Sequence, residues 1–322
     1  MSGVSPWIKA DRPVRIAVFG AGAVGCFYGA RLAQAGAQVT LIARPAHVEA
    51  IARDGLAFES GGKTVQVRID ASAKPDPLRD ADLILLCVKT LDTELAAREI
   101  ASLARPDAIV VSMQNGVDNV ERIAAASGID ALAAVVYVAA SMPAAGHLRH
   151  AGRGDLILGE YGPAPAGVAR LANRARLVAD LFEHAGVACP VSDDVRGALW
   201  GKLVVNCAYN PLSALGEVRY GVMVADEVTR GLMRAVVAEC HAVASADGVR
   251  LAPFEALYRD VIAVGHAMAP ATSSTQQDLA RGKLTEIDSL NGYVVRRGQA
   301  LGMATPVNDT LQALVHLREK TL

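Results

Sequence analysis

Short apolar runs alternate with helical patterns along the first half of the chain. Strand-like runs cover residues 16–19, 39–43, 82–88, 109–113 and 132–140, and helical stretches lie at 31–35, 93–103 and from 117 onward. Continuous apolar strands are typical of a parallel sheet that is covered by helices on both faces. The pattern therefore predicts a doubly wound α/β sheet of the Rossmann type.

Two glycine-containing segments in this half favour hairpins. Residues 56–60 and 64–69 flank Gly61-Gly62, a pair suited to a two-residue turn. Residues 147–150 and 155–158 flank a second glycine-rich segment, 152–154, and we expect them to pair across it. A helix at 168–185 and a strand at 187–191 then complete the predicted sheet domain.

Strand patterns stop after residue 193. Helical patterns take their place at 194–206, 226–246, 254–267 and 285–301. The chain is thus predicted to be an α/β protein with an N-terminal Rossmann doubly wound sheet, residues 13–192, and a mostly α-helical C-terminal domain, residues 193–322. Two domains also suit a chain of 322 residues.

Composition narrows the class of protein. The chain is 52% hydrophobic and 20% charged with a net charge of −1, so it can bury a large core and has little electrostatic attraction for nucleic acid. Its five cysteines show no CxxC or zinc-like spacing, which indicates reduced core residues and no metal. Polar residues interrupt the apolar stretch 131–148 before it could span a membrane. We expect a cytoplasmic protein.

The most informative motif is a glycine-rich turn after the first predicted strand. It reads Gly20-Ala21-Gly22-Ala23-Val24-Gly25 and opens a helix, the context that a dinucleotide-binding turn requires. Gly20 permits the tight turn, Gly22 lets a pyrophosphate approach, and Gly25 lets the helix lie close to the sheet. The alternative is a purely structural glycine turn.

The end of the second strand bears on the choice of cofactor. NAD-preferring proteins carry an acidic residue there, but this chain has Arg44, which suits a 2′-phosphate. Lys89, directly after the strand at 82–88, is either a second cation for that phosphate or a solvated lysine at a strand end. NADP(H) is therefore favoured over NAD.

A polar stripe marks the helical half. Lys202, Asn206 and Asn210 recur every four residues and share one face if the segment is helical. Burying them among apolar neighbours without partners would be costly, so the stripe should face a polar ligand or cavity; a solvated face is the alternative. Pro211 is expected to disrupt the helix just past Asn210.

Other polar residues have ordinary structural explanations when taken singly. Ser273 or Ser274 suits the cap of a following helix, and Glu286 suits a first-turn carboxylate. Asn115, in the sequence Met-Gln-Asn-Gly at 113–116, ends a predicted strand at the edge where Rossmann ligands bind. It is either a turn former or a cofactor contact.

Taken together, GAGAVG, the QNG at 114–116, WGKLVVNCAYNPLSAL and TEIDSLNG closely resemble the ketopantoate reductase family. Members reduce 2-dehydropantoate with NADPH in pantothenate synthesis. The resemblance implies that Lys202 is the proton donor and that Asn206, Asn210 and Ser274 hold the substrate. It also implies that Glu286 and Asn115 lie where cofactor and substrate meet, and it favours Arg44 and Lys89 as 2′-phosphate ligands. Ala140, at the end of the strand 132–140, is included among the cofactor contacts.

The chemistry agrees with these residue types. Hydride transfer to a ketone leaves negative charge on oxygen, which the Lys202 ammonium can stabilise and protonate, with Glu286 in support. We therefore predict an NADP-dependent reductase that forms (R)-pantoate. The alternatives are a reductase of another branched 2-oxo acid and a noncatalytic NADP(H)-sensing protein. Ala271 and Tyr220 are apolar or large where some family members have a polar residue, which bears on the substrate. The expected partner is a small 2-oxo acid, with a homodimer as an option and neither nucleic acid nor membrane.

Overall fold

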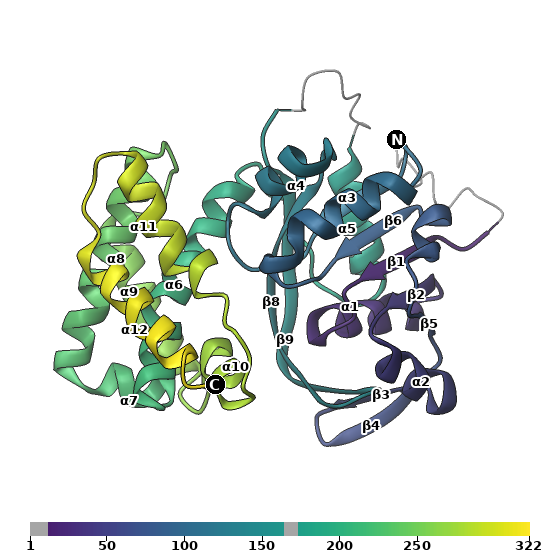
Figure 1. The fold of residues 1–322 in the computed structure, drawn as a ribbon, viewed down its shortest axis with the longest axis horizontal. Coiled ribbons are helices and arrows are strands. Elements are labelled where there is room, and N and C mark those ends of the chain that lie inside the picture. Colours follow the sequence, from purple (N-terminus) through teal and green to yellow (C-terminus); the bar gives the residue numbers. More distant parts are fainter. Residues whose placement is uncertain (1–11, 164–172) are drawn as a thin grey trace. The chain divides into compact units, whose positions relative to one another are not determined.

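The computed structural model describes residues 12–163 and 173–322, and the chain divides into two compact units, Met1–Val195 and Arg196–Leu322. Figure 1 shows one unit built on a sheet and one built of helices. The division lies three residues after the 192/193 boundary predicted from the sequence.

The N-terminal unit is built on a nine-stranded sheet with the order β4-β3-β9-β8-β7-β6-β1-β2-β5. Its central strands β8, β7, β6, β1, β2 and β5 pair in parallel, as the apolar runs predict, whereas β8–β9 and β3–β4 are antiparallel. The strands are β1 (Arg15–Phe19), β2 (Gln38–Ile42), β3 (Leu56–Ser60), β4 (Lys63–Val67), β5 (Asp70–Ser72), β6 (Leu83–Leu86), β7 (Ile109–Ser112), β8 (Leu132–Ala144) and β9 (His147–Glu160).

Helices cover both faces of the central part of this sheet, which is why strands such as β1 and β6 are almost entirely apolar. Ile16 and Val18 of β1 belong to one core cluster with residues of α1 and α5, while Ala17, between them, is also buried. The α/β prediction for this half is therefore confirmed. The helices are α1 (Ala23–Gln34), α2 (Pro45–Asp54), α3 (Thr93–Leu103), α4 (Asn119–Ser127) and α5 (Arg174–His184), with 3-10 turns at Asp76–Asp80 and Thr90–Asp92.

One predicted hairpin is confirmed and the other is wrong. Gly61 and Gly62 both have positive φ, 57° and 74°, and connect β3 to β4. The glycines at 152–154 do not form a turn, because β9 runs through them and pairs with β8 along its length. The residues there form a bulge, with Arg153 at φ 54° and a register shift opposite Tyr137 and Val138. The hairpin turn lies instead before His147.

The second unit is helical, as predicted, and Arg196–Leu322 contains no strand. Its central helix is α8, whose buried face includes Met233, Val236, Val237 and Cys240. The helices are α6 (Val195–Gly216), α7 (Tyr220–Ala225), α8 (Glu227–Ala246), α9 (Phe254–Ala267), α10 (Ser274–Ala280), α11 (Asn291–Ala300) and α12 (Pro306–Glu319), with a 3-10 turn at Ile287–Ser289.

The cysteines match the sequence interpretation. All five are free, and four of them are buried, with Cys87 partly so. Burial raises the pKa of the Cys26 thiol to about 12, which keeps it protonated at neutral pH. Residues 12–163 and 173–322 contain no group of histidine, cysteine or carboxylate side chains arranged for a metal ion. None of the helices in these ranges is long and apolar enough to cross a membrane.

Candidate active site

The predicted cofactor residues gather at one edge of the sheet. Strands β7, β6, β1 and β2 are neighbours and run parallel, so their carboxyl ends meet at that edge. Gly20 follows β1, Arg44 follows β2, Lys89 follows β6 and Asn115 follows β7. Ala140 lies farther along β8, which runs parallel to β7 and continues past Ala133, the last residue that pairs with β7.

The glycine turn is fixed by its backbone. The amides of Gly20 and Ala21 donate to the carbonyl of Ile42 at 3.2 and 3.1 Å, which ties the turn to the end of β2. Gly20 has φ 95°, and a Cβ there would lie 2.6 Å from the backbone nitrogen of Val88. A side chain at Gly20 would therefore strain the turn and collide with the segment that follows β6.

The turn fits the phosphates of a dinucleotide. Gly22 is the N-cap of α1, gives no side-chain cap, and a Cβ placed on it would have no atom within 4 Å. The first turn of α1 also lacks an acidic residue. The first amides of a helix have no partner within the helix, so they can donate to an anion at this exposed end.

Arg44 adds positive charge to the same edge. It is exposed and serves as the N-cap of α2 ahead of Pro45, and its side chain makes no hydrogen bond or ion pair with the described residues. Lys89, also exposed, is the N-cap of the short helix Thr90–Asp92. Since no carboxylate follows β2 in the segment Ala43–Pro45, the edge fits a cofactor with an additional phosphate.

His47 supports this edge and was missed in the sequence. Its Nδ1 accepts a hydrogen bond from the Gly146 amide at 2.7 Å, so its proton is on Nε2, which lies 3.3 Å from the Cys26 sulfur. The Cys26 thiol in turn donates to the Ala21 carbonyl in the glycine turn at 3.3 Å. Burial, followed by the charge of Arg44, lowers the pKa of His47. A neutral imidazole thus links α2 to α1.

Gln114 joins the ends of β6 and β7. Its amide donates to the Val88 carbonyl at 3.1 Å and to the Thr93 hydroxyl at 2.7 Å. The Asn115 carbonyl, next in the chain, accepts from Thr90 and from Asn119. These hydrogen bonds hold the segment at the edge, and the Gln114 amide, whose role was not predicted from the sequence, makes two of them.

The polar stripe of the second unit lies on one helix. Lys202, Asn206 and Asn210 all belong to α6 and share a face of it. Lys202 and Asn206 are partly buried and Asn210 is 3% exposed, so the fully solvated alternative is wrong. Pro211 does not end the helix, because α6 continues to Gly216, and the expected disruption is confined to the backbone hydrogen bond that Pro211 cannot donate.

A side chain outside the helix makes this continuation possible. Pro211 has no amide hydrogen to donate to the carbonyl of Cys207, four residues earlier. The side-chain amide of Asn291 donates to that carbonyl instead, at 3.2 Å, and also to Asn308 Oδ1 at 2.9 Å. Asn291 is fully buried. The signal in the sequence is an asparagine inside the TEIDSLNG motif, but its partner could not be deduced from spacing.

Asn210 and Ser274 are brought together. The Asn210 amide donates to the Ser274 hydroxyl at 3.3 Å. Ser273 is the residue that caps α10, since its hydroxyl accepts from the Gln276 amide at 3.0 Å, and it also donates to the Asn210 carbonyl. The cap is therefore Ser273, and Ser274, which is exposed, remains available for a ligand.

Glu286 lies outside the helix that was predicted over 285–301. It is the N-cap of the 3-10 turn Ile287–Ser289, and α11 begins only at Asn291, after the backbone turns at Leu290 with φ −109° and ψ −103°. The two positions that depart from the family pattern are neighbours, because the Tyr220 amide donates to the Ala271 carbonyl at 3.0 Å.

The fold and these residues define a class: a dinucleotide-dependent oxidoreductase with a Rossmann unit and a helical unit. The family model described as ketopantoate reductase PanE/ApbA matches residues 16–163, and its C-terminal counterpart matches residues 194–319. The chain belongs to the ketopantoate reductase family.

Individual relatives agree over nearly the whole length. A 2-dehydropantoate 2-reductase of Archaeoglobus fulgidus is 34% identical over 94% of this chain and 97% of its own. The crystal structure of a PanE/ApbA family ketopantoate reductase from Ralstonia eutropha JMP134 is 45% identical, with a TM-score of 0.87 over 95% of this chain and 98% of that one. A D-mandelate dehydrogenase solved with NADH and anilino(oxo)acetate is 26% identical, with a TM-score of 0.84 over 95% and 98%.

Proposed function

We infer that this protein is an NADPH-dependent 2-dehydropantoate 2-reductase, which forms (R)-pantoate for pantothenate and coenzyme A biosynthesis. One observation carries the inference. A lysine and two amides, Lys202, Asn206 and Asn210, lie on a single, largely buried face of α6 in a chain of the ketopantoate reductase family. We assign cofactor binding to residues 13–192, and substrate binding and catalysis to residues 193–322.

The cofactor is NADP(H), and the chain's own groups suit it. The amides at the start of α1, in the turn Gly20–Gly25, bind the pyrophosphate, and Arg44 and Lys89 bind the 2′-phosphate. Asn115 and Glu286 contribute near the nicotinamide. When bound, NADPH supplies a hydride to the substrate carbonyl carbon.

Lys202 acts on the substrate oxygen. As the carbonyl carbon gains the hydride, negative charge develops on oxygen, and the ammonium stabilises that charge and gives up a proton to form the hydroxyl. Partial burial strengthens this interaction, because fewer waters screen the charge. Lys202 is therefore the general acid.

The remaining polar groups bind the substrate. Asn206, Asn210 and Ser274 offer neutral amides and a hydroxyl, which bind a carboxylate without a further buried charge. The existing bond from Asn210 to Ser274 fixes the orientation of both groups before substrate arrives. Glu286 accepts a substrate hydroxyl or orients the ammonium of Lys202.

The two alternative functions are less favoured. A reductase of a different 2-oxo acid would share the α6 stripe, and the D-mandelate dehydrogenase neighbour shows that this fold serves such chemistry. Two relatives that are 34% identical, however, are 2-dehydropantoate 2-reductases, whereas the D-mandelate dehydrogenase is 26% identical. A noncatalytic NADP(H) sensor would be expected to have lost Lys202 or Glu286, and both are present.

A substrate panel tests the proposal. Purified protein is mixed with NADPH and, in turn, 2-dehydropantoate, 2-oxoisovalerate, pyruvate and phenylglyoxylate, and NADPH oxidation is followed by absorbance. We expect the highest kcat/KM with 2-dehydropantoate. A higher kcat/KM with any other acid would refute the substrate assignment, and no oxidation with any acid would refute the enzyme assignment.

We also propose a cytoplasmic protein that forms a homodimer. Free, buried cysteines suit a reducing compartment. Light scattering on the purified chain would give the mass of a dimer, and a mass of one chain would refute that part.

A further inference from the structure

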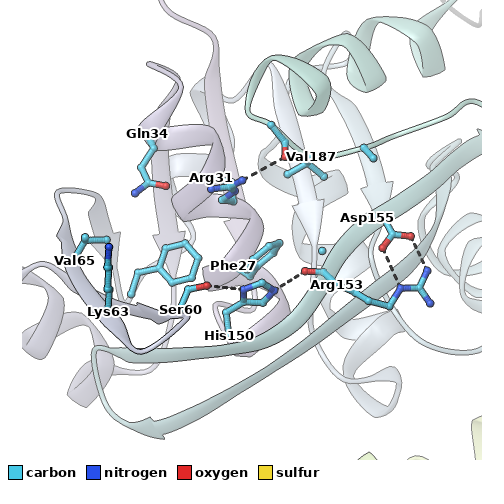
Figure 2. Close-up of a pocket in the computed structure, with 14 residues that line it drawn as sticks. Phe27, Arg31, Gln34, Ser60, Lys63, Val65, His150, Arg153, Asp155 and Val187 are labelled. Atoms are coloured by element: carbon cyan, nitrogen blue, oxygen red, sulfur yellow. Dashed lines mark hydrogen bonds and ion pairs between the residues drawn. The ribbon is translucent and has the colours of Figure 1, made fainter. Parts of the chain in front are cut away.

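A cavity of about 480 Å³ lies in the N-terminal unit and is used by none of the chemistry above. Figure 2 shows its lining, which comes from α1, the β3–β4 hairpin, β9 and the segment that follows α5. Small-molecule sites typically enclose about 300–1,000 Å³. The cavity is thus large enough for a metabolite.

The cavity is separate from the cofactor edge. Phe27, Arg31 and Gln34 line it from one face of α1, and Gln34 is the last residue of that helix. The glycine turn lies at the other end of α1. With a rise of roughly 1.5 Å per residue, Arg31 is about 12 Å along the helix axis from Ala23. A ligand here would not occupy the phosphate-binding turn.

Positive charge in the cavity exceeds negative charge. The carboxylate among the lining residues is Asp155, and Arg153 engages both of its oxygens, at 3.0 and 2.7 Å. Arg31 and Lys63 have no such partner: within residues 12–163 and 173–322 the Lys63 side chain makes no hydrogen bond or ion pair, and the Arg31 side chain makes no ion pair. Two uncompensated cations favour an anion.

Arg31 has unused capacity to donate. One of its Nη atoms donates to the Gly186 carbonyl at 3.3 Å, which anchors the side chain. Its Nε is buried and has no hydrogen-bond partner in the described part of the chain. The other Nη atom makes no hydrogen bond with the described residues, so the guanidinium group can still donate to an anion in the cavity.

A rigid aromatic wall faces these cations. The His150 ring lies 4.6 Å from the Phe27 ring at an angle of 34°, and Phe58 packs edge-on against Phe27. His150 Nε2 must donate to the Arg153 carbonyl, so Nδ1 accepts from the Ser60 hydroxyl at 3.0 Å. In Figure 2, Lys63 and Arg31 lie to the left of and above this ring pair, and Arg153 and Asp155 lie to its right.

We propose that this cavity binds a small organic anion with a planar ring. Its phosphate or carboxylate group pairs with Arg31 and Lys63, and its ring packs against His150 and Phe58. Flat rings and cations together select such ligands over simple ions, because stacking and charge pairing each contribute.

Calorimetry on the protein saturated with NADP⁺ tests this, because the cofactor then blocks adenine probes from the glycine turn. The probes are AMP and benzoate, each with a ring and an anion, and adenosine and inorganic phosphate, which have one feature each. We expect AMP or benzoate to bind with a Kd of about 5 mM or below, and adenosine and phosphate to bind with a Kd at least about tenfold higher. Binding of AMP alone identifies the anion as phosphate; binding of both probes identifies a general anion site.

Variants locate the site. The R31Q/K63Q variant should raise the Kd of the probe at least about tenfold. The control variant R98Q/K74Q removes the same charge from exposed positions outside the cavity and should leave that Kd unchanged. Both variants should keep wild-type turnover of 2-dehydropantoate. K63Q alone alters only an exposed side chain next to the Gly61-Gly62 turn, and it should weaken binding even if R31Q does not fold. No binding of AMP or benzoate at about 5 mM, or equal affinity in wild type and K63Q, would overturn the proposal.

Discussion

Replacing Asn291 by leucine would test how the helix that carries Lys202 is held. The substitution keeps the branched shape of the side chain, although leucine is larger, and removes the donor to the Cys207 carbonyl and to Asn308 Oδ1. Both Asn291 and Asn308 are fully buried, so water cannot replace the lost bonds. The Cys207 carbonyl is left without this donor, and Asn308 Oδ1 keeps only the long hydrogen bond from the Cys240 thiol at 3.8 Å. A buried acceptor left without a partner costs about 1–3 kcal/mol, and we expect the free energy of unfolding to fall by about 2–4 kcal/mol.

Substitution of Pro211 provides the second mutation of a double-mutant cycle with N291L. P211A restores a backbone amide hydrogen four residues after Cys207, the position from which a helix normally donates to that carbonyl. In the P211A background, N291L should therefore cost about 1 kcal/mol less than in the wild type. Urea unfolding followed by circular dichroism gives both free energies, and turnover of 2-dehydropantoate gives a second readout.

Catalytic turnover should depend on how firmly α6, which carries Lys202, is held. We expect N291L to lower kcat while the Kd for NADPH stays unchanged, since Asn291 and its partners all belong to the helical unit. P211A should restore part of kcat to N291L. If the two substitutions were strictly additive in both stability and kcat, Asn291 would not be acting through the Cys207 carbonyl.

Three further predictions concern the N-terminal unit. R44D should lower the NADPH to NADH ratio of kcat/KM by roughly 10–100-fold, because a charged phosphate contact is lost; an unchanged ratio contradicts the assignment. Burial and then Arg44 hold the pKa of His47 below 6.5, so stability falls as pH drops from about 7 to 5. The H47Q variant can still accept the hydrogen bond from the Gly146 amide, and its Tm should fall less than that of the wild type between pH 7 and pH 5. Equal falls in Tm for the two proteins would refute this. Burial raises the pKa of Asp82, but hydrogen bonds from Arg12 and a backbone amide, with nearby arginine charges, outweigh it and the pKa is about 2. D82N should cost about 2 kcal/mol at pH 7 and little near pH 2 by acid unfolding; a cost independent of pH would contradict this.

Local patterns explain what the sequence revealed of the fold. The β1–turn–α1–β2 unit and the Gly61-Gly62 hairpin each depend on residues close together in the chain, so both could be predicted from the local sequence. Two missed helices, α2 and α12, begin with Pro45 and Pro306 at their first position, a start signal that was available. The glycine-rich segment 152–154 was predicted to be a hairpin turn, because bulges and turns favour the same residue types. Only the pairing of β9 with β8 shows that the segment is a bulge.

The candidate site also contains residues that could be grouped from the sequence and contacts that could not. Lys202, Asn206 and Asn210 could be grouped from their spacing, because one helix carries all three. The link from His47 through Cys26 to Ala21 joins separate segments, and so does the bond from Asn291 to Cys207. Such contacts depend on tertiary packing that no local pattern encodes. The supporting residues of the site were therefore found only in the structure.

The most direct test of the account is the turnover of K202M with 2-dehydropantoate and NADPH, measured beside the Kd for NADPH. Methionine keeps most of the length of the lysine side chain and removes the ammonium. We expect kcat to fall by about 10² to 10⁴-fold while NADPH binds as tightly as in the wild type. Wild-type turnover by K202M would show that Lys202 is not the general acid.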